Sequence, residues 1–311
     1  MNGAMMEITT LQGTGAAALA VAGLACIYWG GGRKRSHDKI ERARGALASA
    51  GNLVQLIAQV QQHRGMSAAW RAGDTSFAAR LPEKQGAVRR LFSSVLDAAK
   101  REDGERIPCF VTHDARVLRH EWERLVEGLA DLTPEQSFHT HCRIVATLLD
   151  WLAAIGEARV EQPLSGTIPA VAARNFFHRL PVLVESLGQA RALASAVAAR
   201  RHCPPVSRVR LLFLLSRAES LMTQAQAPGA AAMTEVPAEA RRAVATFVAA
   251  LRDRLIASRE IELSASECFT LGTSAIDAVF AWLAHEQRVL DAALAQGGTA
   301  GNSELAGGIA R

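Results

Sequence analysis

The sequence predicts an all-α protein divided into about eight helices. Three observations lead to this class. Alanine, leucine, arginine and glutamate are abundant, whereas valine and isoleucine do not gather into alternating runs. Apolar residues recur at steps of three and four over long stretches, which is the period of a helix face. Proline- and glycine-containing segments interrupt these stretches at regular places.

These interruptions give the order of the helices along the chain. The fourth helix is marked most clearly, because Pro134 is suited to a helical first turn. The seventh helix follows the linker sequence AQAPGAAAM. The predicted ranges are 34–71, 76–101, 112–128, 131–157, 171–201, 207–226, a seventh helix from 237, and 264–295.

The N-terminal region predicts a single membrane anchor. Residues 9–32 carry no charged side chain, and their densest apolar part ends in Tyr28 and Trp29. Arg33, Lys34 and Arg35 follow residue 32 directly. Because positive flanks stay in the cytoplasm, the N-terminus is expected outside and the rest inside the inner membrane. We therefore expect an extracytoplasmic leader (1–12), an anchor (13–32), a helical sensor domain (33–296) and a disordered tail (297–311).

Charge and cysteine content exclude several classes of protein. The net charge of +5 comes from scattered arginines without basic blocks, so no nucleic-acid partner is expected. Five cysteines with no C-x-x-C pair favour a reduced compartment over a disulfide framework. His139 and His141 lie two residues apart and point in different directions on a helix, so neither zinc nor a cofactor is expected. No nucleophile–base arrangement, phosphate loop or acid pair supports an enzyme.

Arg64 falls on the apolar face of the first long helix. Steps of three and four along that face give Ile40, Ala43, Leu47, Ala50, Val54, Ile57, Gln61, Arg64 and Ala68. Arg191 fits a second such face in the same way, together with Leu180, Val184, Leu187, Ala194 and Ala198. A buried guanidinium must be paired or hydrogen-bonded, because leaving it bare costs several kcal/mol.

Two explanations of these arginines remain open. A bound planar oxyanion could be the partner, because small residues such as Gly65 and Ser67 leave room beside the forked guanidinium. Alternatively, the arginines reach the surface or pair with a carboxylate such as Asp277 or Glu185.

A weak internal repeat suggests two related halves. The segment 62–66 resembles 189–193, and 142–150 resembles 268–277 at nearly the same offset. Short matches also arise by chance in alanine-rich helices. If the duplication is real, the helices form two side-by-side up-down four-helix bundles after the N-terminal transmembrane anchor.

Three segments resemble the nitrate- and nitrite-sensing (NIT) domain of bacterial receptors and antiterminators. They are QHRGMS (62–67), LPVLVESLGQARALAS (180–195) and CFTLGTSAIDAVF (268–280). The resemblance implies two four-helix bundles that bind nitrate or nitrite between helices through arginines. Arg64 matches the arginine of the first motif, Arg191 lies in the second, and Thr273 and Asp277 match the last. The sequence departs from the family at His63, where Glu or Arg is usual, and at Cys268, which replaces an aromatic residue.

The resulting hypothesis is a membrane-anchored cytoplasmic sensor of a small oxyanion, nitrate or nitrite first. Its candidate ligand-binding residues are Arg64, Arg191, His63, Thr273 and Ser67. The signal would pass to a separate protein partner or through a homodimer. The alternative is a ligand-free interaction or scaffold module, whose face over residues 40–57 could serve a coiled coil.

Overall fold

The computed structural model describes the backbone of residues 8–71, 75–226, 235–258 and 260–307, and the side chains within 37–297 apart from 72–74, 227–235 and 259. Over these residues the secondary structure is helical without strands, which confirms the predicted all-α class. The α-helices are α1 (Ile8–Arg71), α2 (Leu81–Glu102), α3 (Thr112–Glu127), α4 (Pro134–Ile155), α5 (Ala170–Arg174), α6 (Leu180–Arg200), α7 (Pro205–Ala225), α8 (Glu235–Leu251) and α9 (Ala265–Gly307). Short 3-10 or π turns are η1 (Thr75–Phe77), η2 (Gly156–Glu161), η3 (Asn175–Arg179) and η4 (Arg252–Ile256).

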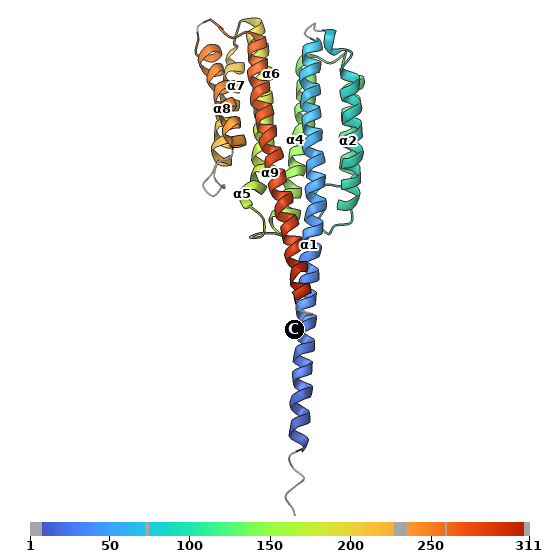
Figure 1. The fold of residues 1–311 in the computed structure, drawn as a ribbon. Helices are drawn as coiled ribbons and strands as arrows, with labels where there is room; N and C mark the ends of the chain where they lie inside the picture. The colour runs from blue at the N-terminus through green and yellow to red at the C-terminus, as the bar shows by residue number, and fades with distance from the viewer. Residues whose placement is uncertain (1–7, 72–74, 227–234, 259, 308–311) are drawn as a thin grey trace, which may run out of the picture.

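The helices pack in two groups. In the first helix group, α1 contacts α2 and α4, and α3 contacts α2 and α4. In the second helix group, α6 contacts α7 and α9, and α8 contacts α9 and α7. The groups stand next to each other (Figure 1), and α1 contacts both α9 and α6 of the second group.

Helices α1 and α9 leave the body together at one end. Figure 1 shows the C-terminal part of α9 beside α1 where both leave the body, and the N-terminal part of α1 continuing alone beyond the end of α9. Within the contact, Arg44 Nη2 donates a hydrogen bond to the Leu294 carbonyl oxygen at 2.9 Å. The backbone of α9 is helical to Gly307, beyond the predicted end near residue 295 and into the tail for which composition predicts disorder.

The side chains of the predicted anchor lie outside the described residues. Residues 1–7 are not described, and for 13–32 only the helical backbone of α1 is. In the part of the chain that the structure describes, no helix has the length and apolar character needed to cross a membrane. The predicted leader and anchor therefore stay predictions.

The predicted start of α4 is confirmed in detail. Thr133 Oγ1 accepts a hydrogen bond from the Gln136 backbone N–H, and the Gln136 side chain accepts one from the Thr133 N–H. This capping box satisfies two backbone donors of the first turn, and Pro134 follows the cap directly.

The helix predicted over 171–201 is in fact α5, the π turn η3 and α6. Pro181 explains the interruption, because proline has no N–H to donate and its ring collides with the preceding helical turn. The π turn also brings Phe177 against Gly156, where an added Cβ would lie 2.3 Å from the Phe177 ring. Only glycine permits this approach of η2 to η3.

Most of the apolar face predicted on the first helix is buried. Ile40, Ala43, Leu47, Ala50 and Ile57 are at most 5% exposed, and Val54 is half-buried. The pattern includes the two polar residues Gln61 and Arg64, which are also buried. It fails in the next turn, where Ala68 is exposed and Ser67 is buried in its place.

Candidate functional site

Arg64 forms a buried ion pair that joins the two helix groups. Its Nη1 lies 2.7 Å from Glu185 Oε1 and its Nη2 lies 3.1 Å from Glu185 Oε2, a bidentate arrangement between α1 and α6. The two side chains are 3% and 9% exposed. Burial is the largest single effect and opposes the charge of Arg64, but the attraction and hydrogen bonds of Glu185 and Cys142 together raise the pKa of Arg64 above its ordinary value.

Three further side chains complete this buried cluster. Gln61 Nε2 donates to Glu185 Oε2 at 2.8 Å, and Gln189 Nε2 donates to Glu185 Oε1 at 2.8 Å. Arg64 Nη1 also lies 3.0 Å from Cys142 Sγ. Of the two carboxylates that the sequence offered as partners of a buried arginine, Glu185 is therefore the partner of Arg64.

Arg191 has a different environment. Its Nη1 donates to Thr273 Oγ1 at 2.7 Å, and its guanidinium carbon lies 4.8 Å from the centre of the Phe269 ring. Among the residues whose side chains are described, no carboxylate forms an ion pair with it. Burial and the nearby charge of Arg64 lower the pKa of Arg191 to about 10, while Asp277 partly offsets them. Arg191 is thus a partly desolvated cation without a direct counter-ion.

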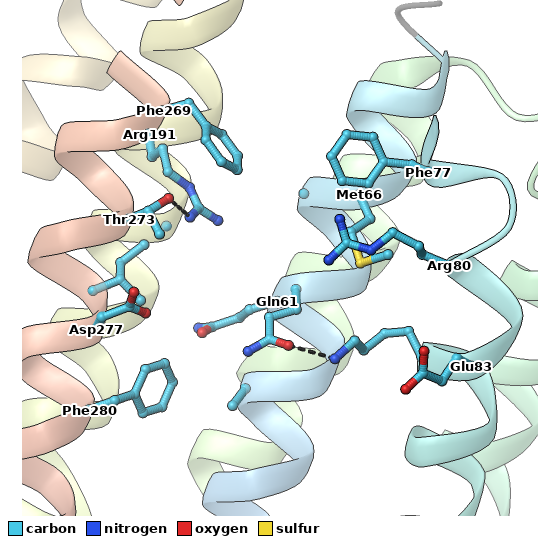
Figure 2. Close-up of a pocket in the computed structure, with 16 residues that line it drawn as sticks. Gln61, Met66, Phe77, Arg80, Glu83, Arg191, Phe269, Thr273, Asp277 and Phe280 are labelled. Atoms are coloured by element: carbon cyan, nitrogen blue, oxygen red, sulfur yellow. Dashed lines mark hydrogen bonds between the residues drawn. The ribbon is translucent and has the colours of Figure 1, made fainter. Parts of the chain in front are cut away.

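The Arg191 side chain lines a cavity of about 480 Å³ between the two helix groups. Figure 2 shows Arg191, Thr273 and Phe269 on one wall and Arg80 and Phe77 on the opposite wall. The remaining lining is Ala58, Gln61, Gln62, Gly65, Met66, Glu83, Lys84, Gly188, Ile276, Asp277 and Phe280.

The two walls carry similar pairs of an arginine and a phenylalanine. The Arg80 guanidinium carbon lies 5.4 Å from the centre of the Phe77 ring, as Arg191 lies over Phe269 across the cavity. Lys84 reaches the same wall as Arg80 and donates to Gln62 Oε1 at 2.7 Å. Cationic groups from α2 and α6 therefore face one space, and an anion is the ligand that this charge favours.

Not all sequence-predicted site residues meet at the cavity. Arg191 and Thr273 line it, whereas Arg64, His63 and Ser67 do not. Ser67 is buried and its Oγ donates to the Arg64 backbone carbonyl at 3.2 Å, which is a local helix contact. Phe269 is 43% exposed at the cavity, while the adjacent Cys268 is fully buried.

His63 points into the first helix group. Its Nδ1 lies 2.8 Å from His141 Nε2, and its ring packs edge-on against Trp122 with the ring centres 4.7 Å apart. His141 Nδ1 lies 2.7 Å from the Ser137 carbonyl oxygen and must carry the proton, since a carbonyl only accepts. His63 Nδ1 then donates to His141 Nε2, and Gln85 Nε2 lies 3.3 Å from His63 Nε2.

Both histidines are neutral in this arrangement. Burial, with a smaller contribution from Lys84, lowers the pKa of His63 to about 4. Burial, followed by the neighbouring His63, lowers the pKa of His141 to about 3. His63 therefore has a structural contact in the core and no hydrogen bond toward the cavity.

Glycine at position 272 makes room for Arg191. A Cβ added there would lie 2.7 Å from Arg191 Cγ and 2.8 Å from its Cβ. We expect Gly272→Ala to displace the Arg191 side chain and to cost about 1–3 kcal/mol of unfolding free energy by overpacking. Urea unfolding measures this loss. Gly86→Ala is the control, because a Cβ there would meet only Arg90 at 3.6 Å, and equal effects of the two changes would contradict the prediction.

The residues that sequence reasoning missed come mainly from a different helix. Arg80 and Lys84 lie on or next to α2, and nothing in their own spacing relates them to Arg191. Gln61 and Gln189 left a weak signal, because they lie three residues from Arg64 and four from Glu185 on the same helix faces.

Comparisons with known proteins identify the fold and the family of the chain. A search of curated proteins gives no significant match. A solved structure, described as the structure of the NasR transcription antiterminator, matches 92% of this chain and 76% of its own with a TM-score of 0.65. Its sequence identity of 17% shows a common fold only. The family described as nitrate and nitrite sensing (NIT) matches residues 55–296, which is most of the chain and includes both cavity walls. The chain therefore belongs to the NIT family.

Proposed function

We propose that the protein is a sensor that binds nitrate or nitrite in the cavity between the two helix groups. The observation that carries this proposal is Arg191, a partly desolvated guanidinium that faces the cavity with no paired carboxylate. Arg64 does not fill this role, because Glu185 already neutralises it. Membership of the NIT family, described as nitrate and nitrite sensing, supports this class of ligand.

The chemistry of Arg191 suits a planar oxyanion. A guanidinium offers parallel N–H donors that match two oxygen atoms of one anion, and the Thr273 hydroxyl lies next to it as a further polar contact. Arg80 and Lys84 on the other wall add positive charge, against Glu83 and Asp277. The lining thus has three cationic and two anionic side chains, and its net positive charge favours a monoanion.

We interpret the two groups of helices as the two four-helix bundles that the family resemblance implies. A ligand held between them contacts α1 on one side and α6 and α9 on the other. Helices α1 and α9 are also the pair that leaves the body together (Figure 1). Ligand binding that changes the spacing of the bundles would change the relation of α1 to α9 at that end.

This connection supports a route for the signal. We propose that α1 and α9 transmit the change to a separate protein partner or to a second copy of the chain. The uncharged segment before Arg33 would anchor α1 in the inner membrane with the main domain in the cytoplasm.

Thermal unfolding with nitrate, nitrite, chloride and sulfate tests the proposed ligand. Nitrate or nitrite at a hundred times the dissociation constant adds about 2.7 kcal/mol of stability, whereas chloride adds less. We expect Arg191→Gln to abolish the increase in melting temperature, because the amide has no charge. Arg200→Gln on the exposed side of the same helix is the matched control. The proposal is wrong if neither nitrate nor nitrite stabilises the unmodified protein. It is also wrong if these anions raise the melting temperature of Arg191→Gln as much as that of the unmodified protein.

A ligand-free interaction module is the second candidate. It is favoured by an apolar surface on α7, where Val206, Val209 and Phe213 are 80%, 68% and 60% exposed. Such a surface is typical of contacts with another protein. A protein that responds to no oxyanion and associates through this surface would support this candidate, and sedimentation of Phe213→Ser would test the contact.

A further inference from the structure

The Glu185 carboxylate has a nearly complete set of hydrogen-bond donors. Its Oε1 accepts from Arg64 Nη1 at 2.7 Å and from Gln189 Nε2 at 2.8 Å. Its Oε2 accepts from Arg64 Nη2 at 3.1 Å and from Gln61 Nε2 at 2.8 Å. Each oxygen thus has two donors, which equals its usual capacity. The anion is solvated by the protein in place of water.

These donors recognise the planar O–C–O group. The guanidinium binds it edge to edge, and one glutamine donates to each oxygen from the side. Nitrite and formate present the same bent, planar arrangement of two oxygens with one negative charge, and nitrate presents it on each of its edges. The donor set therefore has no feature that requires its occupant to be attached to the chain.

We propose that Arg64, Gln61 and Gln189 form a receptor for a small planar monoanion, and that Glu185 occupies this receptor as a ligand supplied by the chain itself. Glu185 then acts as a built-in competitor of external anions. While Glu185 is bound, the guanidinium of Arg64 is not available to an external anion, and Arg191 is the arginine in the cavity that can bind one.

The receptor lies next to the cavity, so an external anion in the cavity would be close to the receptor. Gln61 and Gly188 both line the cavity. A Cβ added to Gly188 would lie 2.7 Å from Arg64 Nη2, so the guanidinium packs directly against a residue that lines the cavity. The same contact explains why α6 needs glycine there.

Exchange of Glu185 for an external anion would also break a link between the helix groups. Arg64 belongs to α1 and Glu185 to α6, and their ion pair crosses the boundary between the groups. An anion bound to Arg64 is not attached to α6 by a covalent bond. The receptor therefore couples anion binding to the contact between the groups, independently of whether Arg191 binds nitrate.

Chemical rescue of Glu185→Ala tests the receptor. Removing the carboxylate leaves Arg64 buried without a counter-ion and opens a space of carboxylate shape. We expect the variant to melt at a lower temperature than the unmodified protein in sodium chloride. Sodium formate or sodium nitrite at matched ionic strength should raise its melting temperature by about 5 °C more than it raises that of the unmodified protein. If the variant is unfolded in chloride, formate should restore its helical circular dichroism.

Two further variants give the controls. Glu185→Gln removes the charge but fills the space, so formate should rescue it much less. Arg64→Met/Glu185→Ala lacks the guanidinium and should show no rescue. Three results would each overturn the proposal. Formate could stabilise Glu185→Ala and the unmodified protein equally, it could rescue the double variant, or it could fail to refold an unfolded Glu185→Ala.

The outcome is separable from that of the nitrate site at Arg191. Rescue should persist in Glu185→Ala/Arg191→Gln, because the receptor does not contain Arg191. Loss of the nitrate response in Arg191→Gln together with rescue in this double variant identifies two sites. If formate rescues Glu185→Ala but not Glu185→Ala/Arg191→Gln, the anion binds in the cavity alone, and the proposed receptor at Arg64 is wrong.

Discussion

Arg64→Met is expected to lower the free energy of unfolding by about 3–5 kcal/mol. The change leaves the Glu185 carboxylate 9% exposed and without its cationic partner, with the neutral donors Gln61 and Gln189 still bonded to it. Most of the loss is the cost of a buried unpaired charge, since methionine fills much of the volume of the arginine stem. Urea unfolding followed by circular dichroism measures it.

The double change Arg64→Met/Glu185→Leu separates charge from packing. Replacing both partners by apolar side chains removes the unpaired carboxylate, so much of the stability should return. Arg143→Met is the matched control, because Arg143 pairs with Glu121 at 2.7 Å but is 67% exposed, and its loss should cost less than about 1 kcal/mol. If Arg64→Met is no more costly than Arg143→Met, the ion pair between the groups does not stabilise the fold.

Acidification is expected to destabilise the protein below about pH 6.5, through His63 and His141. The pKa values of about 4 and about 3 in the folded state lie below the unfolded value of 6.5. As the pH falls below 6.5, the unfolded chain binds protons that the folded chain does not, so stability is full above 6.5 and decreases toward pH 4 and 3. At pH 5 each histidine should remove roughly 2 kcal/mol.

Unfolding in urea at pH 7.5 and at pH 5 measures this loss. His141→Gln is the informative variant, because glutamine can still donate to the Ser137 carbonyl and accept from His63 without titrating. We expect the variant to lose about half as much stability on acidification as the unmodified protein. Replacement of the exposed His139 by glutamine serves as the control and should leave the pH dependence unchanged. An unchanged slope in His141→Gln would contradict the assignment.

The helices could be predicted because each depends on its own stretch of sequence. The face from Ile40 to Arg64 follows from the helical period, and the capping box at Thr133 and Gln136 follows from local hydrogen bonding. The interruption before Pro181 was predictable in principle from the missing N–H, but its π-helical form depends on packing against Gly156. The rotation of α9 that buries Cys268 and exposes Phe269 also depends on neighbouring helices.

Periodicity identified both buried arginines but could not assign their partners. Arg64 and Arg191 occupy equivalent places on their helix faces, yet one pairs with Glu185 and the other with Thr273. Glu185 and Asp277 were both candidates from sequence, and the choice depends on how α1, α6 and α9 cross. His63 likewise lies next to Arg64 in sequence but points to His141 in another helix. Neighbours in a helix diverge by about 100°, so adjacent residues serve different surfaces.

The sequence by itself determined that the protein is all-helical, that Arg64 and Arg191 are exceptional on their apolar faces, and that the chain resembles the NIT family. Only the tertiary structure decided that Arg64 is neutralised by Glu185 while Arg191 faces a cavity with Arg80 and Lys84 on its other wall. The physical reason is the distance along the sequence over which the relevant interactions act. Helix formation and burial patterns are set by residues within a few turns, whereas the partner of a buried charge is set by the helix that packs against it.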